Sequence, residues 1–367
     1  MAGAMFLEPR DAPYPELKKS HTMAHTGRPF TDVKPPPAAP VWAAIEGLAR
    51  YHVLLAAIEL GAFDAVRDAC RATADELADR MGLSPPHLAA LLDGVVALGL
   101  LDKVNEHYSA NDTTRRYLVS DGAACMADLV PVAPGPQHNW TRLADTVRRG
   151  RPATPIENDP ARFYTPLVEG TFTTMWRTAT RLDRIVRYAT AGAAPRVLDL
   201  GAGGAPWTIA ALTACPGGHA VVNDFDRVLE VARRTTAEHG VAARCEFRAV
   251  DYFEIDIEAG SYDLVVLGHV CRAEGAEAAS RLIHRAADAL RPGGRVIVAD
   301  YFLDPERKLN PHAVFMGVTM MANTVNGFTF TTEQFATWLA DAGFVEPRLL
   351  EPIAFQQCMI ATKGDSP

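Results

Sequence analysis

The glycine-rich stretch Val197–Gly204 constrains the fold of this chain more than any other part of the sequence. It begins with Val197-Leu198-Asp199-Leu200, a mostly apolar run, and continues into Gly201-Ala202-Gly203-Gly204. A helix-competent apolar segment, Ile209–Leu212, comes next. This order is typical of a buried parallel strand that leads through a tight turn into a helix. Because glycine has no Cβ atom, such a turn lets backbone N–H groups approach a ligand closely.

Strands and helices alternate after this turn, which predicts an α/β fold with a Rossmann-like, seven-stranded sheet covered by helices on both faces. The predicted strands are Arg196–Leu200, Ala220–Asn223, Cys245–Ala249, Leu264–Gly268, Arg295–Ala299, Arg348–Phe355 and Gln357–Thr362. Predicted helices lie near 205–214, 226–239 and 276–290, and a capping-box spacing at Thr331–Gln334 opens another. We expect the last two strands to form an antiparallel hairpin at one edge of the sheet.

Three further regions precede this domain, which we place at 191–367. Residues 1–40 are rich in proline and are predicted to be a flexible arm. Residues 41–125 contain helical periodicities followed by a short hairpin, which predicts a winged-helix-like domain. Residues 126–190 are predicted to form a linker of short, proline-divided helices that roofs a pocket. The predicted recognition helix, 86–97, carries no Arg or Lys, so we favour dimerisation over DNA binding for this domain.

Composition narrows the class of protein further. A net charge of −8 argues against a nucleic-acid partner. The six cysteines have no metal-ligand spacing and predict reduced thiols, hence a cytoplasmic protein. We find no signal peptide and no apolar run long enough to cross a membrane, so we expect no membrane partner. We also expect no protein-bound metal.

Polar residues at the ends of successive strands indicate which ligand the glycine turn holds. Asp199 would repel a pyrophosphate and attract a cationic ligand. Asp224 ends the second strand, where a carboxylate can accept hydrogen bonds from both ribose hydroxyls. Asp251-Tyr252 follows the third strand. There, the carboxylate can accept a hydrogen bond from an exocyclic amine, and the aromatic ring can pack against a purine. Ribose, adenine and a positive charge together describe S-adenosyl-L-methionine.

These features carry a family resemblance that covers about residues 41–364. The chain resembles the class I S-adenosylmethionine-dependent methyltransferases, and among them the small-molecule O-methyltransferases with an N-terminal winged-helix dimerisation domain. The matching motifs, in order, are Val197–Gly203, Asp224, Asp251-Tyr252, Asp263–Gly268, Arg291-Pro292-Gly293-Gly294 and Gly343-Phe344. The resemblance implies that Gly201 and Gly203 pack against the methionine part of the cofactor. It also implies a homodimer or higher homo-oligomer acting on a small molecule.

The catalytic position departs from the family pattern. Where the family has a His-Asp pair whose His deprotonates a substrate hydroxyl, this chain has Arg272-Ala273. Arginine does not act as a base at ordinary pH. His269 and Glu169 are the candidate bases, with a structural histidine as the alternative for His269. Arg272 is predicted either to bind an anionic substrate or to form a salt bridge with Glu274 or Asp300.

Several aromatic residues complete the predicted pocket, each with plain core packing as the alternative. The predicted pocket residues are Phe163, Tyr164, Trp176, Trp207 and His312. Together with Arg272 they favour methylation of a small, anionic secondary metabolite, with a leaning to C-methylation of a prenyl diphosphate or 2-oxo acid. The first alternative is O-methylation of a phenol or hydroxyl with a non-standard base. The second is a non-methylating enzyme or a winged-helix regulator.

Overall fold

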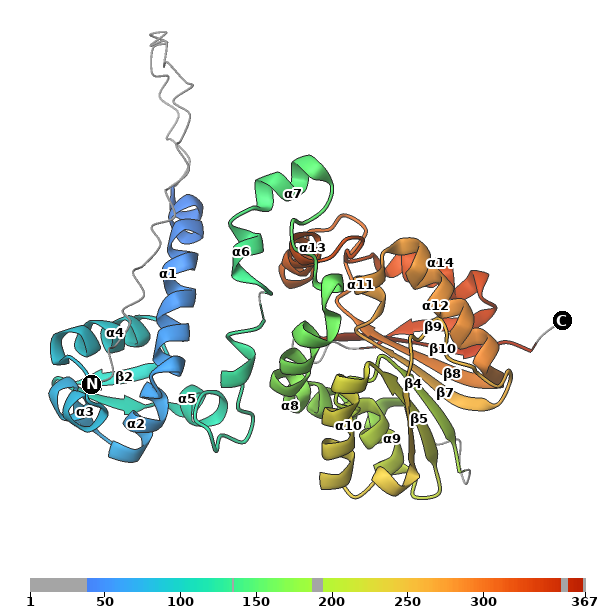
Figure 1. Ribbon diagram of the computed structural model, residues 1–367, viewed down its shortest axis with the longest axis horizontal. Helices are drawn as coiled ribbons and strands as arrows, with labels where there is room; N and C mark the ends of the chain where they lie inside the picture. The colour runs from blue at the N-terminus through green and yellow to red at the C-terminus, as the bar shows by residue number, and fades with distance from the viewer. Residues whose placement is uncertain (1–37, 134, 187–193, 351–355, 366–367) are drawn as a thin grey trace, which may run out of the picture. The chain divides into compact units, whose positions relative to one another are not determined.

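The computed structural model describes residues 38–133, 135–186, 194–350 and 356–365, with the backbone alone for 182–186 (Figure 1). The predicted arm, 1–40, lies almost wholly outside these ranges. The chain divides into two compact units, Met1–Leu48 and Ala49–Pro367. Helix α1 (Ala39–Glu59) includes the boundary between them.

Helix α1 has an apolar composition and an exposed apolar face. Val41, Trp42, Ile45 and Leu48 are each about 60% exposed or more. With 21 residues and a mean hydropathy of 1.3, the helix passes the length and composition test for a membrane span, which no other helix does within the part of the chain that the structure describes. By that test alone, the prediction that no apolar run is long enough was wrong. Helices that pack against protein pass the same test, so it is weak evidence for a membrane.

The rest of the N-terminal domain is mainly helical, as predicted. Its elements are α2 (Ala62–Ala69), β1 (Ala72–Thr73), α3 (Ala74–Met81), α4 (Pro85–Ala97), β2 (Leu101–Val104) and β3 (His107–Ala110). The strands form an antiparallel sheet in the order β1-β3-β2. Thr73 begins α3 with a complete capping box. A core around Phe63, Leu77 and Leu92 holds these elements together.

The region between the two domains contains α5 (Asp112–Tyr117), α6 (Gln137–Trp140), α7 (Leu143–Arg149), two 3₁₀ turns (Ala127–Leu129 and Ile156–Asn158) and α8 (Pro160–Val186). The sequence predicts short helices divided by prolines up to Pro160, followed by a mixed apolar and basic helix. That last helix is the 27-residue α8, which begins at Pro160 and continues through Pro166. Packing of α8 on its neighbours α9 and α10 outweighs the one backbone hydrogen bond that proline removes.

The C-terminal domain is built on the predicted seven-stranded sheet, in the order β6-β5-β4-β7-β8-β10-β9. The strands are β4 (Arg196–Leu200), β5 (His219–Asp224), β6 (Cys245–Ala249), β7 (Tyr262–Gly268), β8 (Leu290–Asp300), β9 (Phe344–Leu349) and β10 (Gln357–Lys363). Only β10 runs antiparallel to its neighbours β8 and β9. The predicted strand 348–355 was misplaced. Its counterpart β9 starts at Phe344, directly after the left-handed turn residue Gly343 (φ 79°), and residues 351–355 lie outside the described ranges.

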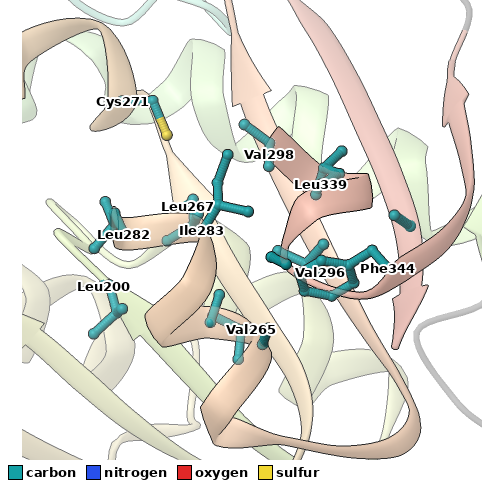
Figure 2. Close-up of a cluster of buried hydrophobic side chains, with 14 of the residues drawn as sticks. Leu200, Val265, Leu267, Cys271, Leu282, Ile283, Val296, Val298, Leu339 and Phe344 are labelled. Carbon is teal, nitrogen blue, oxygen red and sulfur yellow. The ribbon is translucent and has the colours of Figure 1, made fainter. Parts of the chain in front are cut away.

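Helices cover both faces of this sheet (Figure 1). One face packs against α8, α9 (Pro206–Ala214) and α10 (Asp226–Glu238). The other packs against α12 (Ala276–Ala289) and α14 (Thr332–Asp341), and Figure 2 shows Leu267, Ile283 and Val298 in that layer. The short α11 (Cys271–Glu274) follows β7, the 3₁₀ turn Ala242–Arg244 precedes β6, and α13 (Pro311–Asn323) follows β8. The burial of both faces explains why the central residues of β7, Leu264–Leu267, form a continuous apolar run.

Candidate functional site

The glycine turn lies where the carboxyl ends of β4, β5 and β7 meet. Gly201 and Gly203 have φ values of 65° and 59°, in the left-handed region that favours glycine. A Cβ atom on Gly201 would lie 2.3 Å from the side chain of Val270, and one on Gly203 would lie 3.2 Å from that of Val168. Both conformation and close packing therefore require glycine at Gly201.

Asp224 faces this turn from the end of β5. One carboxylate oxygen accepts a hydrogen bond from the backbone N–H of Gly203 (2.7 Å), and the other accepts one from that of Phe225 (2.8 Å). Burial raises the pKa of Asp224 to about 6. An ionised carboxylate has further lone pairs, so this oriented group can also accept ribose hydroxyls.

Asp199 supplies a second buried carboxylate beneath the turn. It is fully buried, and Thr208 of α9 donates a hydrogen bond to Oδ2 at 2.7 Å. Its Oδ1 has no hydrogen-bond partner among the residues that the structure describes. Burial raises the pKa of Asp199 to about 7, as expected for a carboxylate without a compensating cation. A ligand with a positive charge at this end of the turn would supply that cation, so the residues fit a sulfonium cofactor with an amino-acid tail.

Tyr252 and Asp251 lie at the exit of β6. The Tyr252 hydroxyl donates a hydrogen bond to Glu274 of α11, and its ring lies 3.8 Å from the Cβ position of Gly201. Asp251 is exposed, and its Oδ1 accepts a hydrogen bond from the backbone N–H of Phe253 at 2.7 Å. The structure thus gathers the predicted cofactor residues at one edge of the sheet, in positions that suit an adenosyl group.

The raised pKa of Asp224 predicts how cofactor binding depends on pH. Ribose hydroxyls bond best to the ionised carboxylate, so affinity should fall by up to about tenfold per pH unit below pH 6. Titrations with S-adenosylhomocysteine between about pH 5 and 8 measure this dependence by calorimetry. Asp224→Asn should bind weakly with the dependence near pH 6 removed. Asp199→Asn is the control. It removes the other carboxylate, whose pKa is about 7, and should leave the dependence near pH 6 in place.

A second polar cluster lies beside the cofactor residues, where β7 and β8 end. The Arg272 guanidinium donates to Asp300 at 3.1 Å and to the backbone carbonyl of His269 at 2.8 Å. Asp300 also accepts hydrogen bonds from the backbone N–H groups of Arg272 and Tyr301. Its side chain is only 2% exposed. Of the two alternatives raised for Arg272, the structure shows the salt bridge, with Asp300 and not Glu274 as the partner.

The backbone of His269, which also belongs to this cluster, has a conformation that is unusual for any residue other than glycine. Its φ is 64°, and its side chain is only 10% exposed. Within the described part of the chain, neither ring nitrogen has a hydrogen-bond partner, and Nδ1 lies 3.9 Å from Asp300. Burial, and then the charge of Arg272, lower the pKa of His269 well below 6.5. The imidazole is therefore neutral at physiological pH and has a free acceptor nitrogen.

Aromatic rings surround the cluster. The Tyr301 ring packs against His269 (ring centroids 5.3 Å apart), against His312 of α13 (5.1 Å) and against the Arg272 guanidinium (5.2 Å). Tyr164 of α8 is half-buried, and the removal of its hydroxyl from water raises the pKa of that group, while the nearby charge of Arg272 lowers it in part. Two of the predicted pocket residues, Tyr164 and His312, therefore reach the cluster.

The structure places the other predicted residues elsewhere. Glu169 forms a half-exposed salt bridge with Arg234 of α10 at 2.7 Å, so it has a surface partner rather than the setting of a general base. Trp176 packs against His239 next to α10 (ring centroids 5.0 Å apart). Trp207 is buried in the core, and its indole packs against Gly268. A Cβ atom added to Gly268 would lie 2.9 Å from the indole nitrogen.

Phe163 packs edge-on against its neighbour Tyr164, with ring centroids 5.2 Å apart. Tyr301, by contrast, was not predicted for the site, and Asp300 was predicted only as one of two possible salt-bridge partners of Arg272. The signal that identified Asp224 and Asp251 could have found them, because they too directly follow a predicted apolar strand.

Comparisons with known proteins agree with this geometry. Residues 140–345 match the O-methyltransferase domain family, and residues 42–120 match the O-methyltransferase dimerisation domain. A 3-hydroxy-5-methyl-1-naphthoate 3-O-methyltransferase of Streptomyces sahachiroi is 28% identical over 317 residues, which are 82% of this chain and 88% of that protein. The N,N-dimethyltransferase OxyT of Streptomyces rimosus is 27% identical, over 84% of this chain and 92% of that protein.

Solved structures share the fold. Human N-acetylserotonin methyltransferase in complex with S-adenosylmethionine superimposes with a TM-score of 0.76 at 20% identity, over 92% of this chain and 100% of that one. An O-methyltransferase family protein from Burkholderia thailandensis gives a TM-score of 0.77 at 22% identity, over 91% and 100%. The family matches span the N-terminal domain and most of the sheet. The chain belongs to the O-methyltransferase family with an N-terminal dimerisation domain and is an S-adenosylmethionine-dependent methyltransferase.

Proposed function

We propose that this enzyme methylates a hydroxyl oxygen of a small aromatic natural product. Curated relatives act on such oxygens: besides the naphthoate enzyme, they include the tetracenomycin 8-O-methyltransferase of Streptomyces glaucescens and the mitomycin 6-O-methyltransferase of Streptomyces lavendulae. OxyT, an N-methyltransferase by name, makes a nitrogen acceptor the second candidate. C-methylation, which the sequence features favoured, has no counterpart in the names of these relatives.

The observation that carries this proposal is the pairing of Arg272 with Asp300. An anchor for an anion such as a diphosphate would need a guanidinium whose charge is not already compensated. Because the buried carboxylate compensates the guanidinium charge, little positive potential is left for a multiply charged substrate. A substrate with neutral oxygen groups suits this pair better. The Nε of Arg272, which has no hydrogen-bond partner among the described residues, remains as a donor for one such oxygen.

The proton of the substrate hydroxyl then needs an acceptor, and we assign this role to His269. Its imidazole is neutral and buried, and both ring nitrogens lack partners in the described ranges of the chain. S-adenosylmethionine supplies an electrophilic methyl group when bound. The chain's own residues orient the two reactants: Asp224 and Tyr252 hold the nucleoside, while Tyr301 and Tyr164 confine a flat acceptor beside His269.

We also expect a homodimer in the cytoplasm. The dimerisation domain, 42–120, includes most of the exposed apolar face of α1, which a second subunit would cover. All six cysteines are free thiols, in keeping with a reducing compartment.

Labelled methyl transfer tests the proposal directly. The enzyme is incubated with ¹³C-methyl S-adenosylmethionine and a panel of naphthols, hydroxyquinones, aromatic amines, 2-oxo acids and prenyl diphosphates. Carbon NMR of each product distinguishes a methyl group on oxygen from one on nitrogen or carbon. We expect methoxy products from the hydroxylated aromatics. Products methylated only on carbon or nitrogen would overturn the proposal.

A further inference from the structure

Asn223, next to the cofactor carboxylate Asp224, makes an unusual set of contacts at the end of β5. It is fully buried. Its side-chain Nδ2 donates to the backbone carbonyl of Arg248 at 3.0 Å and to that of Val250 at 2.6 Å. Its own backbone carbonyl accepts a hydrogen bond from Ala202 in the glycine turn at 2.9 Å. One residue therefore contacts both the loop after β4 and the loop after β6.

The second of these side-chain bonds reaches beyond the backbone ladder of the sheet. Strands β5 and β6 pair in register up to Asp224 and Ala249, where the ladder ends. The carbonyl of Val250 lies one residue past that last pair and bonds to the Asn223 amide instead. The next two residues are Asp251 and Tyr252. The amide therefore fixes the chain immediately before the adenine-side residues.

We propose that Asn223 is a positioning residue for the nucleoside half of S-adenosylmethionine. Through its amide it holds Asp251 and Tyr252 at a fixed distance from Asp224, so that ribose and adenine are recognised together. Only the donor half of the amide is needed for this role, because no described residue forms a hydrogen bond with Oδ1. Asn223 itself need not touch the cofactor.

The experiment compares two ligands that share a nucleoside but differ in the amino-acid tail. S-adenosylhomocysteine has both halves, whereas 5′-methylthioadenosine has the nucleoside alone. Asn223→Asp keeps the shape of the side chain but replaces the donor with an acceptor that faces two carbonyl oxygens. We expect the Kd of both ligands to rise by a similar factor, about tenfold or more. The KM for the methyl acceptor at saturating cofactor should stay unchanged.

Asn139→Asp is the matched control. Asn139 of α6 is also buried, and its Nδ2 also makes two hydrogen bonds, to Thr154 and Asn323, both at 3.0 Å. This variant should lose stability without losing nucleoside affinity. Asn223→Ser, which keeps a hydroxyl donor, should fall between the wild type and Asn223→Ala, and these two variants carry the test if the aspartate variant does not fold.

Two results would overturn the proposal. One is a folded Asn223 variant that binds 5′-methylthioadenosine as tightly as the wild type does. The other is an equal loss of nucleoside affinity in the Asn139 control, which would show that any disturbed buried amide has this effect.

Discussion

Arg272→Met should lower the free energy of unfolding by about 3 kcal/mol, the lower end of the range for breaking a buried ion pair. The substitution leaves the Asp300 carboxylate, only 2% exposed, without its counter-charge. It also removes the donor to the His269 carbonyl. Two backbone N–H groups still bond to Asp300, which keeps the loss near the lower end. Urea denaturation followed by circular dichroism measures the change.

A double variant distinguishes the effect of breaking the ion pair from the effect of losing the packing of the arginine side chain. Because Arg272→Met/Asp300→Leu removes both charges, it should recover most of the stability that Arg272→Met loses. If the double variant is no more stable than the single one, the guanidinium contributes through packing on Tyr301 rather than through its charge.

The same single variant also distinguishes the two interpretations of Arg272. Were the guanidinium an anchor for an anionic substrate, the KM for the acceptor should rise strongly and stability should change little. The salt bridge predicts a large loss of stability instead, with only a modest rise in KM from the loss of the single hydrogen bond that Nε donates to a neutral oxygen. Reported together, the KM and the unfolding free energy therefore settle which role dominates.

The sequence predicted the sheet well because it depends on local signals. Acidic residues at or just past the carboxyl ends of successive strands, Asp199, Asp224 and Asp251, likewise led us to expect the cofactor at this edge of the sheet. Prediction was poorer where long-range contacts decide. Nothing local in the sequence shows that α8 continues through Pro166, because its packing against α9 and α10 makes this possible.

The same limit applies to individual side chains of the site. The partner of Arg272 could be Glu274 or Asp300 by sequence, and only the pairing of β7 with β8 brings Asp300 within 3.1 Å. Similarly, Glu169 and Trp176 both lie on α8, in the segment predicted to roof the pocket. Their side chains contact Arg234 and His239, on or next to α10. The sequence does not show which side of α8 faces α10.

Replacing His269 tests the assigned proton acceptor and requires variants that suit its backbone. At φ 64°, asparagine and glycine are tolerated, whereas most other residues would add strain. His269→Asn should lower kcat by about 10²- to 10⁴-fold, the usual contribution of a general base, with little change in S-adenosylhomocysteine affinity. His239→Asn is the control, since that histidine packs on Trp176 instead.

Chemical rescue separates a base from a packing role. His269→Gly leaves space where the imidazole ring was, and free imidazole added to the assay should restore part of the lost kcat. The wild-type rate should decline only at pH values well below 6.5, because burial and Arg272 lower the pKa of His269 and keep its ring neutral above that range. In the glycine variant, the rescued rate should instead follow the ordinary titration of imidazole. A variant that keeps wild-type kcat, or one that imidazole does not rescue while the fold is intact, would exclude His269 as the proton acceptor.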